Sequence, residues 1–557
     1  MAPQSQRSSL RKAIDALSHH ARRHVGVGVM CAVAYFDPGN WSVDLQAGSQ
    51  FGYKLLFMVL VAGLGAVVLQ VLACKLGCVT GLDLASHCRL LLNNHPKYPR
   101  LVRRLFLYPL YGLAELSIIS TDLAELLGSA IGLCLIFPKL PLWVAVLLTA
   151  SDVFIILLVG DPSRGHGRPV RTFEIIIVVL VLIVFICFVI LIVKVKPHWP
   201  AVFDGLIPSK TVILPNGLYA AIGILGATVM PHALFLGSFL ATQDRVSSGP
   251  PVLGSPATAN IASRRTWQTA LRSILYMEKS ERDFIEKDHR TPHGERENNT
   301  LSFIRAHLSH GIVDIVGSLL GFAVAINSAI LVLAAAVFFY GPGRPIDGPS
   351  RPAGLFDAHD LIRDLIGKPA AFVFALALIC SGQTASITAT LAGQVVSEGF
   401  IEWRMSPFLR RIVTRLIGLI PSLAIAVAVG RPGIDTLLVI SQVVLSVVLP
   451  FVAFPLVWLT SSRLVMGVRK PRELVTAPAD DNSSADKPPE NAETNADVHE
   501  IAKVDSQQVE EKIRSPGMVC DDETVDYSNG RFLTMLSYLL WLVILVANGY
   551  LVVTLAI

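Results

Sequence analysis

Charged residues are scarce in this chain of 557 amino acids. Asp, Glu, Lys and Arg make up only 16% of it, whereas hydrophobic residues make up 52%. A soluble globular protein usually carries about 25% charged residues. The deficit argues against an ordinary soluble domain and indicates a membrane protein. The net charge of +5 is small for this length, so we expect no nucleic-acid partner.

Other familiar signatures are also missing. Most of the eight cysteines lie in apolar stretches, and Cys74 and Cys78 have no nearby His, so neither a disulfide framework nor a zinc site is expected. Residues 1–24 are polar and basic and lack the apolar run of a secretory signal peptide. The chain has no helical His-Glu-x-x-His, no phosphate-binding glycine loop and no nucleophile elbow. An enzyme is therefore the least expected class.

Long apolar stretches dominate instead. A helix that spans a bilayer needs about 20 mostly apolar residues, and about eleven stretches meet that need. They lie near 25–48, 53–74, 105–135, 143–160, 172–194, 215–241, 310–340, 369–394, 411–430, 434–460 and 532–555. The sequence predicts an all-α polytopic membrane protein with about 11 transmembrane helices.

Two polar segments divide these stretches. Residues 242–305 hold Ser, Gly, Pro and many charges, and residues 461–531 are acidic with almost no aromatics. We expect both to be exposed loops and the second to be disordered. The predicted organisation is an N-terminal tail (1–24), a first five-helix repeat (25–194), a connection with helix 6 (195–241), a long loop (242–305), helices 7–10 (306–460), a second loop (461–531) and helix 11 (532–557).

Basic residues predict the orientation. The N-terminal tail carries five Lys or Arg and residues 75–104 carry six more. Such residues gather on the cytoplasmic side, so we expect the N-terminus and both long loops there, although residues 341–368 on the opposite side also carry four. The sequon at Asn298 would then go unused. Plasma, endosomal and vacuolar membranes all remain open.

Two of the apolar stretches are interrupted. The first contains Asp37-Pro38-Gly39-Asn40, and the sixth contains Met230-Pro231-His232. Proline breaks the helical hydrogen-bond ladder, and irregular backbone survives in a membrane only where it is buried in protein or lines a cavity. Breaks at matching positions indicate an inverted repeat of helices 1–5 and 6–10, with the substrate between broken helices 1 and 6.

The residues at the breaks are potential metal ligands. Asp37 offers a carboxylate, Asn40 an amide oxygen, Ala227 a carbonyl freed by the break and Met230 a thioether. Oxygen ligands alone suit calcium or magnesium, whereas a soft sulfur favours manganese, iron and cobalt. Alternatively, Met230 only fills space.

Acids on the third stretch indicate a proton route. At 100° per residue, Glu115, Asp122 and Glu125 fall within an arc of about 80°, and acids on one face of a membrane helix indicate a pathway. His232 beside the second break suits proton transfer. The alternatives are a Glu115 that lies in water and a His232 that only packs. Arg415 should pair with an acid that the sequence does not identify.

These motifs resemble the Nramp family (natural resistance-associated macrophage proteins). Three further segments are similar: residues 382–394 resemble the family's transport signature between helices 8 and 9, residues 120–125 its helix 3, and Ser441-Gln442-Val443 with Leu449-Pro450-Phe451 its helix 10. Thr384 and Ala385 depart from the usual Ser. The resemblance covers roughly residues 25–460, and the long loops look like those of fungal members.

The resemblance implies a LeuT-like fold and proton-coupled symport of divalent transition metals toward the cytoplasm by alternating access. The expected cargo is manganese or iron, with cobalt, zinc and cadmium as further candidates. The implied metal ligands are Asp37, Asn40, the Ala227 carbonyl and Met230, which Gln442 approaches in some states. The implied proton route comprises His232, Asp122, Glu125 and Glu115. No cofactor is expected, since the metal is substrate and protons are the coupling ions. The long loops are where cytoplasmic regulators would bind.

Two rival functions stay open at this point. A transporter of the same fold could carry an organic solute, although an Asp and Met pair would suit that substrate poorly. A metal sensor could bind the ion without moving it and signal through its long loops. Measuring metal entry separately from metal binding distinguishes these alternatives.

Overall fold

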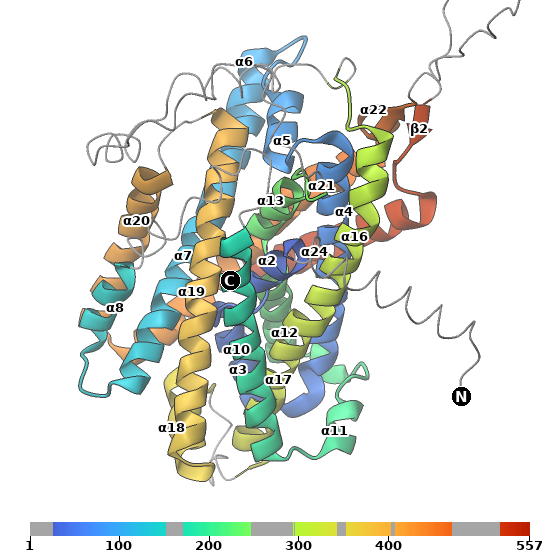
Figure 1. Cartoon of the computed structure of the whole chain (residues 1–557). Coiled ribbons are helices and arrows are strands. Elements are labelled where there is room, and N and C mark those ends of the chain that lie inside the picture. The colour runs from blue at the N-terminus through green and yellow to red at the C-terminus, as the bar shows by residue number, and fades with distance from the viewer. Residues whose placement is uncertain are drawn as a thin grey trace, which may run out of the picture. The chain divides into compact units, whose positions relative to one another are not determined.

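The computed structural model describes residues 26–151, 171–246, 293, 296–341, 352–402, 407–470 and 524–556 (Figure 1). The first half of the chain forms α2 (Val27–Val33), α3 (Pro38–Phe51), η1 (Gly52–Leu55), α4 (Leu56–Thr80), α5 (Leu84–Leu92), α6 (Pro99–Val102), η2 (Arg103–Leu107), α7 (Tyr108–Ile136), α8 (Leu142–Ala150), α10 (Arg171–Val195), α11 (Trp199–Asp204), η4 (Lys210–Ile213), α12 (Pro215–Thr228) and α13 (Pro231–Leu240).

The second half forms α16 (Leu301–Ser318), η6 (Leu319–Val324), α17 (Ala325–Ala334), η7 (Ala335–Phe339), α18 (Leu355–Leu365), α19 (Lys368–Ile401), α20 (Pro407–Ala428), α21 (Arg431–Ser461), α22 (Arg463–Met466) and α24 (Arg531–Ala556). Two short strands, β1 (Gly467–Arg469) and β2 (Thr524–Asp526), form a two-stranded sheet. The expected all-α membrane class is confirmed, with these strands as an addition that the sequence did not predict.

Eight helices in the described residues are long and apolar enough to cross a membrane. A ninth, Ile412–Ala428 in α20, is shorter, and the predicted stretch 143–160 is described only as far as residue 151. The predicted number of eleven spans therefore stays a prediction. The tail 1–24, most of 242–305 and most of 461–531 lie outside the described residues. Helix α16 begins at Leu301, a few residues before the predicted end of the first long loop.

The chain divides into one unit of residues 1–468 with 526–557 and another of residues 469–525. The helices that form the candidate site all belong to the first unit. Two of its membrane helices are interrupted where the sequence predicted, as α2 and α3 and as α12 and α13. Pro38 and Pro231 each open the second half, where a proline is tolerated because the first amide of a helix has no acceptor.

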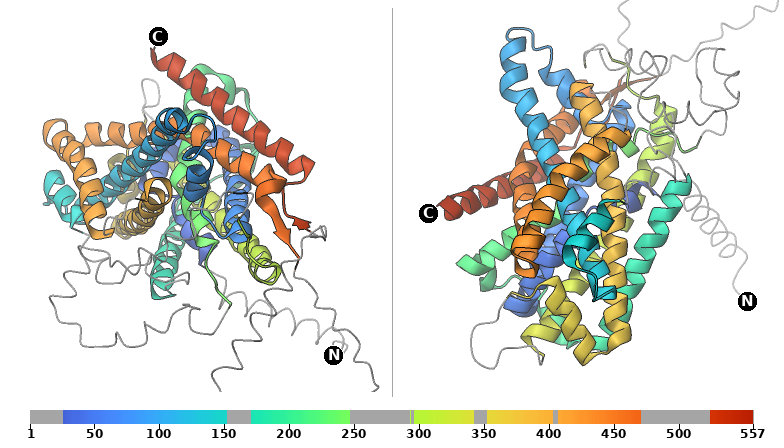
Figure 2. Two further views of the ribbon diagram at one scale, coloured as in Figure 1. Left: turned by 90° about the horizontal axis from the view of Figure 1, so that it is seen from above. Right: turned by 90° about the vertical axis from the view of Figure 1, so that its left-hand side faces the viewer.

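The two interrupted helices cross in opposite directions. Helix α2 packs against α13, and α3 packs against α12, so the first half of each helix contacts the second half of the other. Figure 2 shows these segments at the centre of the bundle. Antiparallel pairing of this kind is what an inverted repeat requires. It brings both breaks to the same region of the protein.

Side chains from two distant helices and from α3 satisfy the backbone at the first break. The carbonyl of Tyr35 accepts a hydrogen bond from Asn327 Nδ2 of α17 at 2.7 Å. The carbonyl of Phe36 accepts from Ser381 Oγ of α19 at 2.7 Å and from Trp41 Nε1 at 2.8 Å. Unsatisfied backbone groups cost several kcal/mol in a membrane. These three side chains therefore stabilise the unwound conformation.

A glycine allows α7 to approach the first break. A Cβ atom at Gly128 would collide with the ring of Pro38. Cores that are already packed tolerate added methyl groups poorly, at a cost of about 1–3 kcal/mol. The contact places the acids of α7 beside the broken helix.

We predict that Gly128→Ala lowers the melting temperature of the purified protein, because the new methyl group pushes α7 away from Pro38. The measurement is thermal unfolding followed by intrinsic fluorescence. Gly317→Ala is the matched control, since no atom lies within 4 Å of a Cβ at that position. Equal melting temperatures for the two variants would contradict the close approach.

Candidate metal and proton site

Asp37 terminates the first break and caps α3. Its Oδ1 accepts hydrogen bonds from the Asn40 backbone amide at 2.8 Å and from Asn40 Nδ2 at 2.7 Å. The side chain is fully buried, and its Oδ2 accepts no hydrogen bond from any residue that the structure describes. One carboxylate oxygen is therefore held in place while the other remains available to a cation.

The second break contributes a carbonyl and a thioether. Residue 231 is proline, so the Ala227 carbonyl lacks the amide that would normally donate to it from four residues ahead. Met230 precedes α13 as its N-cap residue, and both Ala227 and Met230 are buried. The break thus leaves an oxygen and a sulfur ligand at the end of α12, which packs against α3.

Gln442 of α21 also reaches the first break. A Cβ atom at Gly39 would collide with the Gln442 side-chain amide, so the two residues are in direct contact. Gln442 Oε1 is buried and accepts no hydrogen bond from the described residues. Buried polar atoms are rarely left unsatisfied unless a ligand or water completes them. The family resemblance implied that Gln442 approaches the metal ligands only in some states. In this structure Gln442 lies at the break.

The set of candidate ligands fits a divalent transition metal. Within the described ranges no three His, Cys, Asp or Glu side chains form a metal-holding group. The candidate ligands are instead the single Asp37 carboxylate, the Asn40 and Gln442 amides, the Ala227 carbonyl and the Met230 thioether. Hard oxygens with one soft sulfur suit manganese or iron better than magnesium. We treat all five as proposed ligands.

His232 lies on the second break and contacts α7. Its Nδ1 is 3.2 Å from Thr121 Oγ1, and Thr121 donates its own hydroxyl proton to the Ser117 carbonyl at 2.9 Å. The Thr121 oxygen must therefore accept from His232 Nδ1–H, which leaves the lone pair on Nε2. That Nε2 is buried and has no hydrogen-bond partner among the described residues. It is well placed to accept a proton.

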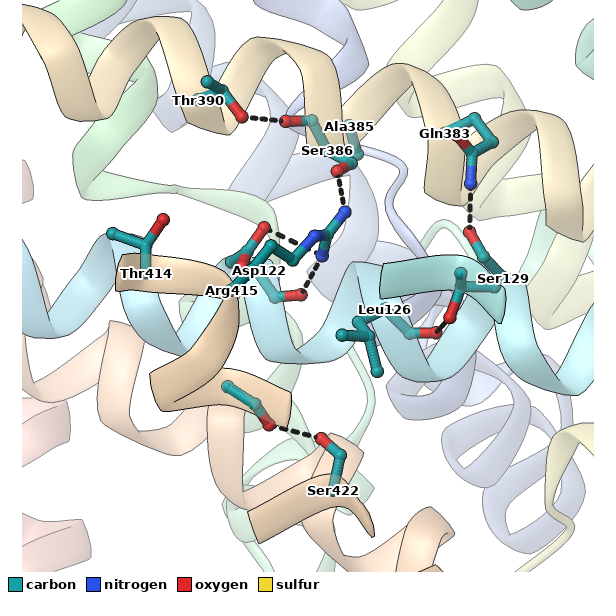
Figure 3. Close-up of polar contacts among 12 residues, drawn as sticks. Asp122, Leu126, Ser129, Gln383, Ala385, Ser386, Thr390, Thr414, Arg415 and Ser422 are labelled. Carbon is teal, nitrogen blue, oxygen red and sulfur yellow. Dashed lines mark hydrogen bonds and ion pairs between the residues drawn. The ribbon is translucent and has the colours of Figure 1, made fainter. Parts of the chain in front are cut away.

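The structure identifies the partner of Arg415. The guanidinium of Arg415 on α20 lies 2.9 Å from Asp122 Oδ1 on α7, and both side chains are almost fully buried. It also donates to the Asp122 carbonyl at 3.3 Å and to Ser386 Oγ of α19 (Figure 3). A buried cation usually pairs with an acid, and three helices converge to provide this arrangement.

A second ion pair lies further along α7. Arg410 of α20 binds both oxygens of Glu115, at 2.7 and 2.9 Å. A small cavity of about 10 Å³ is lined by Asp122, Arg410 and Thr414 between the two pairs, which is about the space of one water. Glu125, the third predicted acid, is buried one turn beyond Asp122. Three of the predicted proton residues, the acids, thus lie on α7, and the fourth, His232, lies on α13.

The sequence signature at 382–394 does not connect two helices. It lies inside α19, which runs from Lys368 to Ile401, so the expected position between helices 8 and 9 is wrong. Within it, Ser386 binds Arg415, and Gln383 donates to Ser129 of α7 at 3.3 Å (Figure 3). Polar side chains of the signature therefore join α19 to α7 and α20.

Sequence reasoning missed several of these residues. Arg410, Thr121 and Ser386 hold the predicted acids and histidine in place, and Asn327 and Ser381 support the break. Arg410 gave one usable signal, because it is a second cation on the helix of Arg415. The hydroxyl and amide side chains gave none, since such residues are common in membrane helices.

The two faces of the bundle differ in access. We call the face where α2 begins the amino-terminal face. There Asp314 Oδ2 accepts hydrogen bonds from the backbone amides of Gly26 at 3.2 Å and Gly28 at 2.7 Å. Arg245 beyond α13 pairs with Glu174 of α10 at 2.6 Å, and both side chains are about 95% buried. These contacts hold α2 closed against its neighbours.

A cavity approaches the breaks from the opposite face. It has a volume of about 120 Å³ and is formed by α3, α12 and α21, with Gln46, Gln50, Asn216 and Tyr219 on its walls and Gln442 among its lining residues. Two helices interrupted in mid-membrane, with buried unsatisfied ligands reached from one face, define a membrane transporter of the broken-helix class.

Comparisons with known proteins identify the family. The model for "Natural resistance-associated macrophage protein-like" proteins matches residues 28–478. The chain belongs to this Nramp family, whose members are metal transporters and not enzymes. Among solved structures, the manganese transporter of Eremococcus coleocola has a TM-score of 0.63 and 28% identity, and covers 94% of this chain and 84% of its own.

Fungal and bacterial transporters are among the similar sequences. The iron transporter SMF3 of Saccharomyces cerevisiae is 36% identical across 98% of both chains. The manganese transporter pdt1 of Schizosaccharomyces pombe is 38% identical across 80% of this chain and 76% of its own. The divalent metal cation transporter MntH of Listeria innocua is 37% identical across 80% and 83%.

We predict that Asp37→Asn weakens manganese binding by more than about tenfold, because it removes the charged ligand; disturbing even the outer partners of a metal site costs about 10–100-fold. Isothermal titration of the purified protein measures the change. Asp204→Asn, on the exposed surface, is the control and should bind normally. Unchanged affinity in Asp37→Asn would rule out this carboxylate as a ligand.

Proposed function

We propose that the protein is a proton-coupled symporter that moves divalent transition-metal ions toward the cytoplasm by alternating access. The observation that carries the proposal is the pair of buried, unsatisfied oxygens, Asp37 Oδ2 and Gln442 Oε1, at the break of α2 and α3. A cation between them would satisfy both. The cavity that reaches Gln442 supplies the approach.

Manganese and iron are the proposed cargo. The named relatives include manganese and iron transporters. In this chain the Met230 thioether adds a soft ligand to the oxygens, and soft ligands favour such ions over calcium and magnesium. Met230 is completely buried. Its sulfur therefore contacts protein and not water, so a metal ion would not compete with water for the sulfur.

Proton coupling follows from competition at one carboxylate. Asp37 must be deprotonated to bind a metal, so metal binding releases any proton that the carboxylate carries. The acceptor that we propose for this proton is His232 Nε2, and the route continues through the acids of α7. Asp122 and Glu115 are held by Arg415 and Arg410, with room for one water between the pairs.

The proposed direction rests on the orientation. If the N-terminus is cytoplasmic, the amino-terminal face is the inner face, and the cavity of about 120 Å³ lies toward the outside. The structure then represents an outward-facing state. Inward opening requires α2 to leave its contacts with Asp314 and the Arg245–Glu174 pair to separate. Separating a buried pair of this kind costs several kcal/mol if either charge stays buried without its partner, so water must reach both charges as they part.

Uptake into liposomes tests this function. We expect manganese to enter faster under an inward proton gradient with excess calcium and magnesium present. Asp37→Ala should abolish entry, and Met230→Ala should retain entry but lose discrimination against calcium. Manganese that binds without entering would indicate a sensor instead. Neither entry nor binding by folded protein would contradict the proposal entirely.

Asp122→Asn tests the coupling separately. The neutral side chain cannot carry the proton and removes the charge that lies 2.9 Å from the Arg415 guanidinium. We expect manganese entry to continue while its stimulation by acid falls more than about tenfold, since a positioned proton carrier contributes about 10²–10⁴-fold in rate. The measurement is uptake as a function of the pH difference, with Asp204→Asn as control. Full stimulation in Asp122→Asn would count against the route.

A further inference from the structure

One stretch of the amino-terminal face carries strong uncompensated charge. Residues 97–108, which we call the basic segment, contain Lys97, Arg100, Arg103 and Arg104, and no acid occurs between Asp83 and Glu115. The segment covers α6, η2 and the first residue of α7, and α6 lies at the end of the bundle in Figure 1. The ion pairs to Asp122 and Glu115 come from Arg415 and Arg410, not from this segment.

The four basic side chains differ from several other arginines of the described structure. Arg89, Arg245, Arg410 and Arg415 each bind a carboxylate. In the described part of the chain, none of the four basic residues of the segment forms such a pair. Arg103 donates only to the Asn93 carbonyl, at 3.1 Å, which fixes its position without neutralising it. The segment therefore presents positive charge to whatever adjoins it.

A row of exposed apolar side chains accompanies the charge. Tyr98, Leu101, Leu105, Phe106 and Tyr108 are between 48% and 62% exposed. Arg100, Arg103 and Arg104 share one side of the helix by their spacing, and Leu101, Leu105 and Tyr108 share the adjacent side. Basic side chains beside aromatic and aliphatic ones are typical of the boundary between lipid headgroups and acyl chains.

We propose that the basic segment binds the headgroups of anionic phospholipids, with its apolar row inserted at the edge of the acyl region. Clusters of four or more Lys and Arg next to a membrane helix have this affinity. A soluble anion would use only the charges, whereas a lipid also uses Leu101 and Leu105. The orientation proposed above places the segment at the cytoplasmic leaflet, where anionic lipids are concentrated.

The consequence concerns the scaffold on which transport depends. The basic segment continues directly into α7, which carries Asp122 and Glu125 and packs against α3, α19, α20 and α21. Bound headgroups would anchor the start of α7 at the membrane surface. The anchored helix could then stay fixed while α2 moves, so anionic lipid would favour transport without contacting the metal.

Native mass spectrometry of the full chain tests the proposal. Purified protein is equilibrated with equal amounts of phosphatidylserine and phosphatidylcholine, and the retained lipids are counted. We expect preferential retention of phosphatidylserine. In the variant R100Q/R103Q/R104Q the preference for phosphatidylserine should fall about fivefold for each charge removed. Each basic residue near the membrane surface contributes about that factor.

The control variant K194Q/K196Q/K210Q removes three exposed charges near the ends of α10 and η4 on the opposite face. It should keep the preference of the wild type. Manganese binding, measured in parallel, shows that each variant is folded and separates this proposal from the transport function. Equal preference in the wild type and R100Q/R103Q/R104Q, or equal loss in the control, would overturn the proposal.

Discussion

The hydrogen-bonding groups of two interrupted helices constrain most of this structure. In a membrane, each freed backbone group must find a partner inside the protein. Asn327, Ser381 and Trp41 serve the carbonyls of Tyr35 and Phe36. These contacts draw α17 and α19 to the first break. Among the buried polar atoms that have no hydrogen-bond partner in the described residues, Asp37 Oδ2 lies at the first break and Gln442 Oε1 belongs to the side chain in contact with it.

Buried charged side chains are under the same constraint, because each of them also needs a partner inside the protein. An acid in the membrane interior is stable only with a partner or a proton. Helix α20 supplies two arginines, and each lies opposite an acid of α7. Ser386 in α19 binds the deeper arginine, so three helices share one polar cluster (Figure 3). This arrangement lets α7 carry charged side chains close to the proposed metal ligands while it stays packed against its neighbours.

The sequence predicted the features whose signals are local. Pro38 and Pro231 act on their own helices, so the positions of the breaks were readable from residue types, whereas the metal ligands beside them stay a prediction. The acids of α7 were predicted to share one side because helical periodicity alone decides it. The comparisons then showed the family that the motifs resemble.

Features that depend on contacts between distant helices were not predictable. Asp122 and Arg415 are 293 residues apart, and nothing in either local pattern indicates the other. Gln442 reaches the break only because Gly39 has no side chain. The position of residues 382–394 was wrong because it came from the family resemblance alone, whereas here these residues lie in α19 and bind neighbouring helices.

The central claim is that both breaks together hold the metal. A structure of the protein grown with manganese, with anomalous scattering recorded at the manganese edge, tests it most directly. We expect one peak within coordinating distance of Asp37 Oδ2, the Ala227 carbonyl and Met230 sulfur. A peak elsewhere in the folded protein, or one that contacts only one of the two breaks, would contradict it.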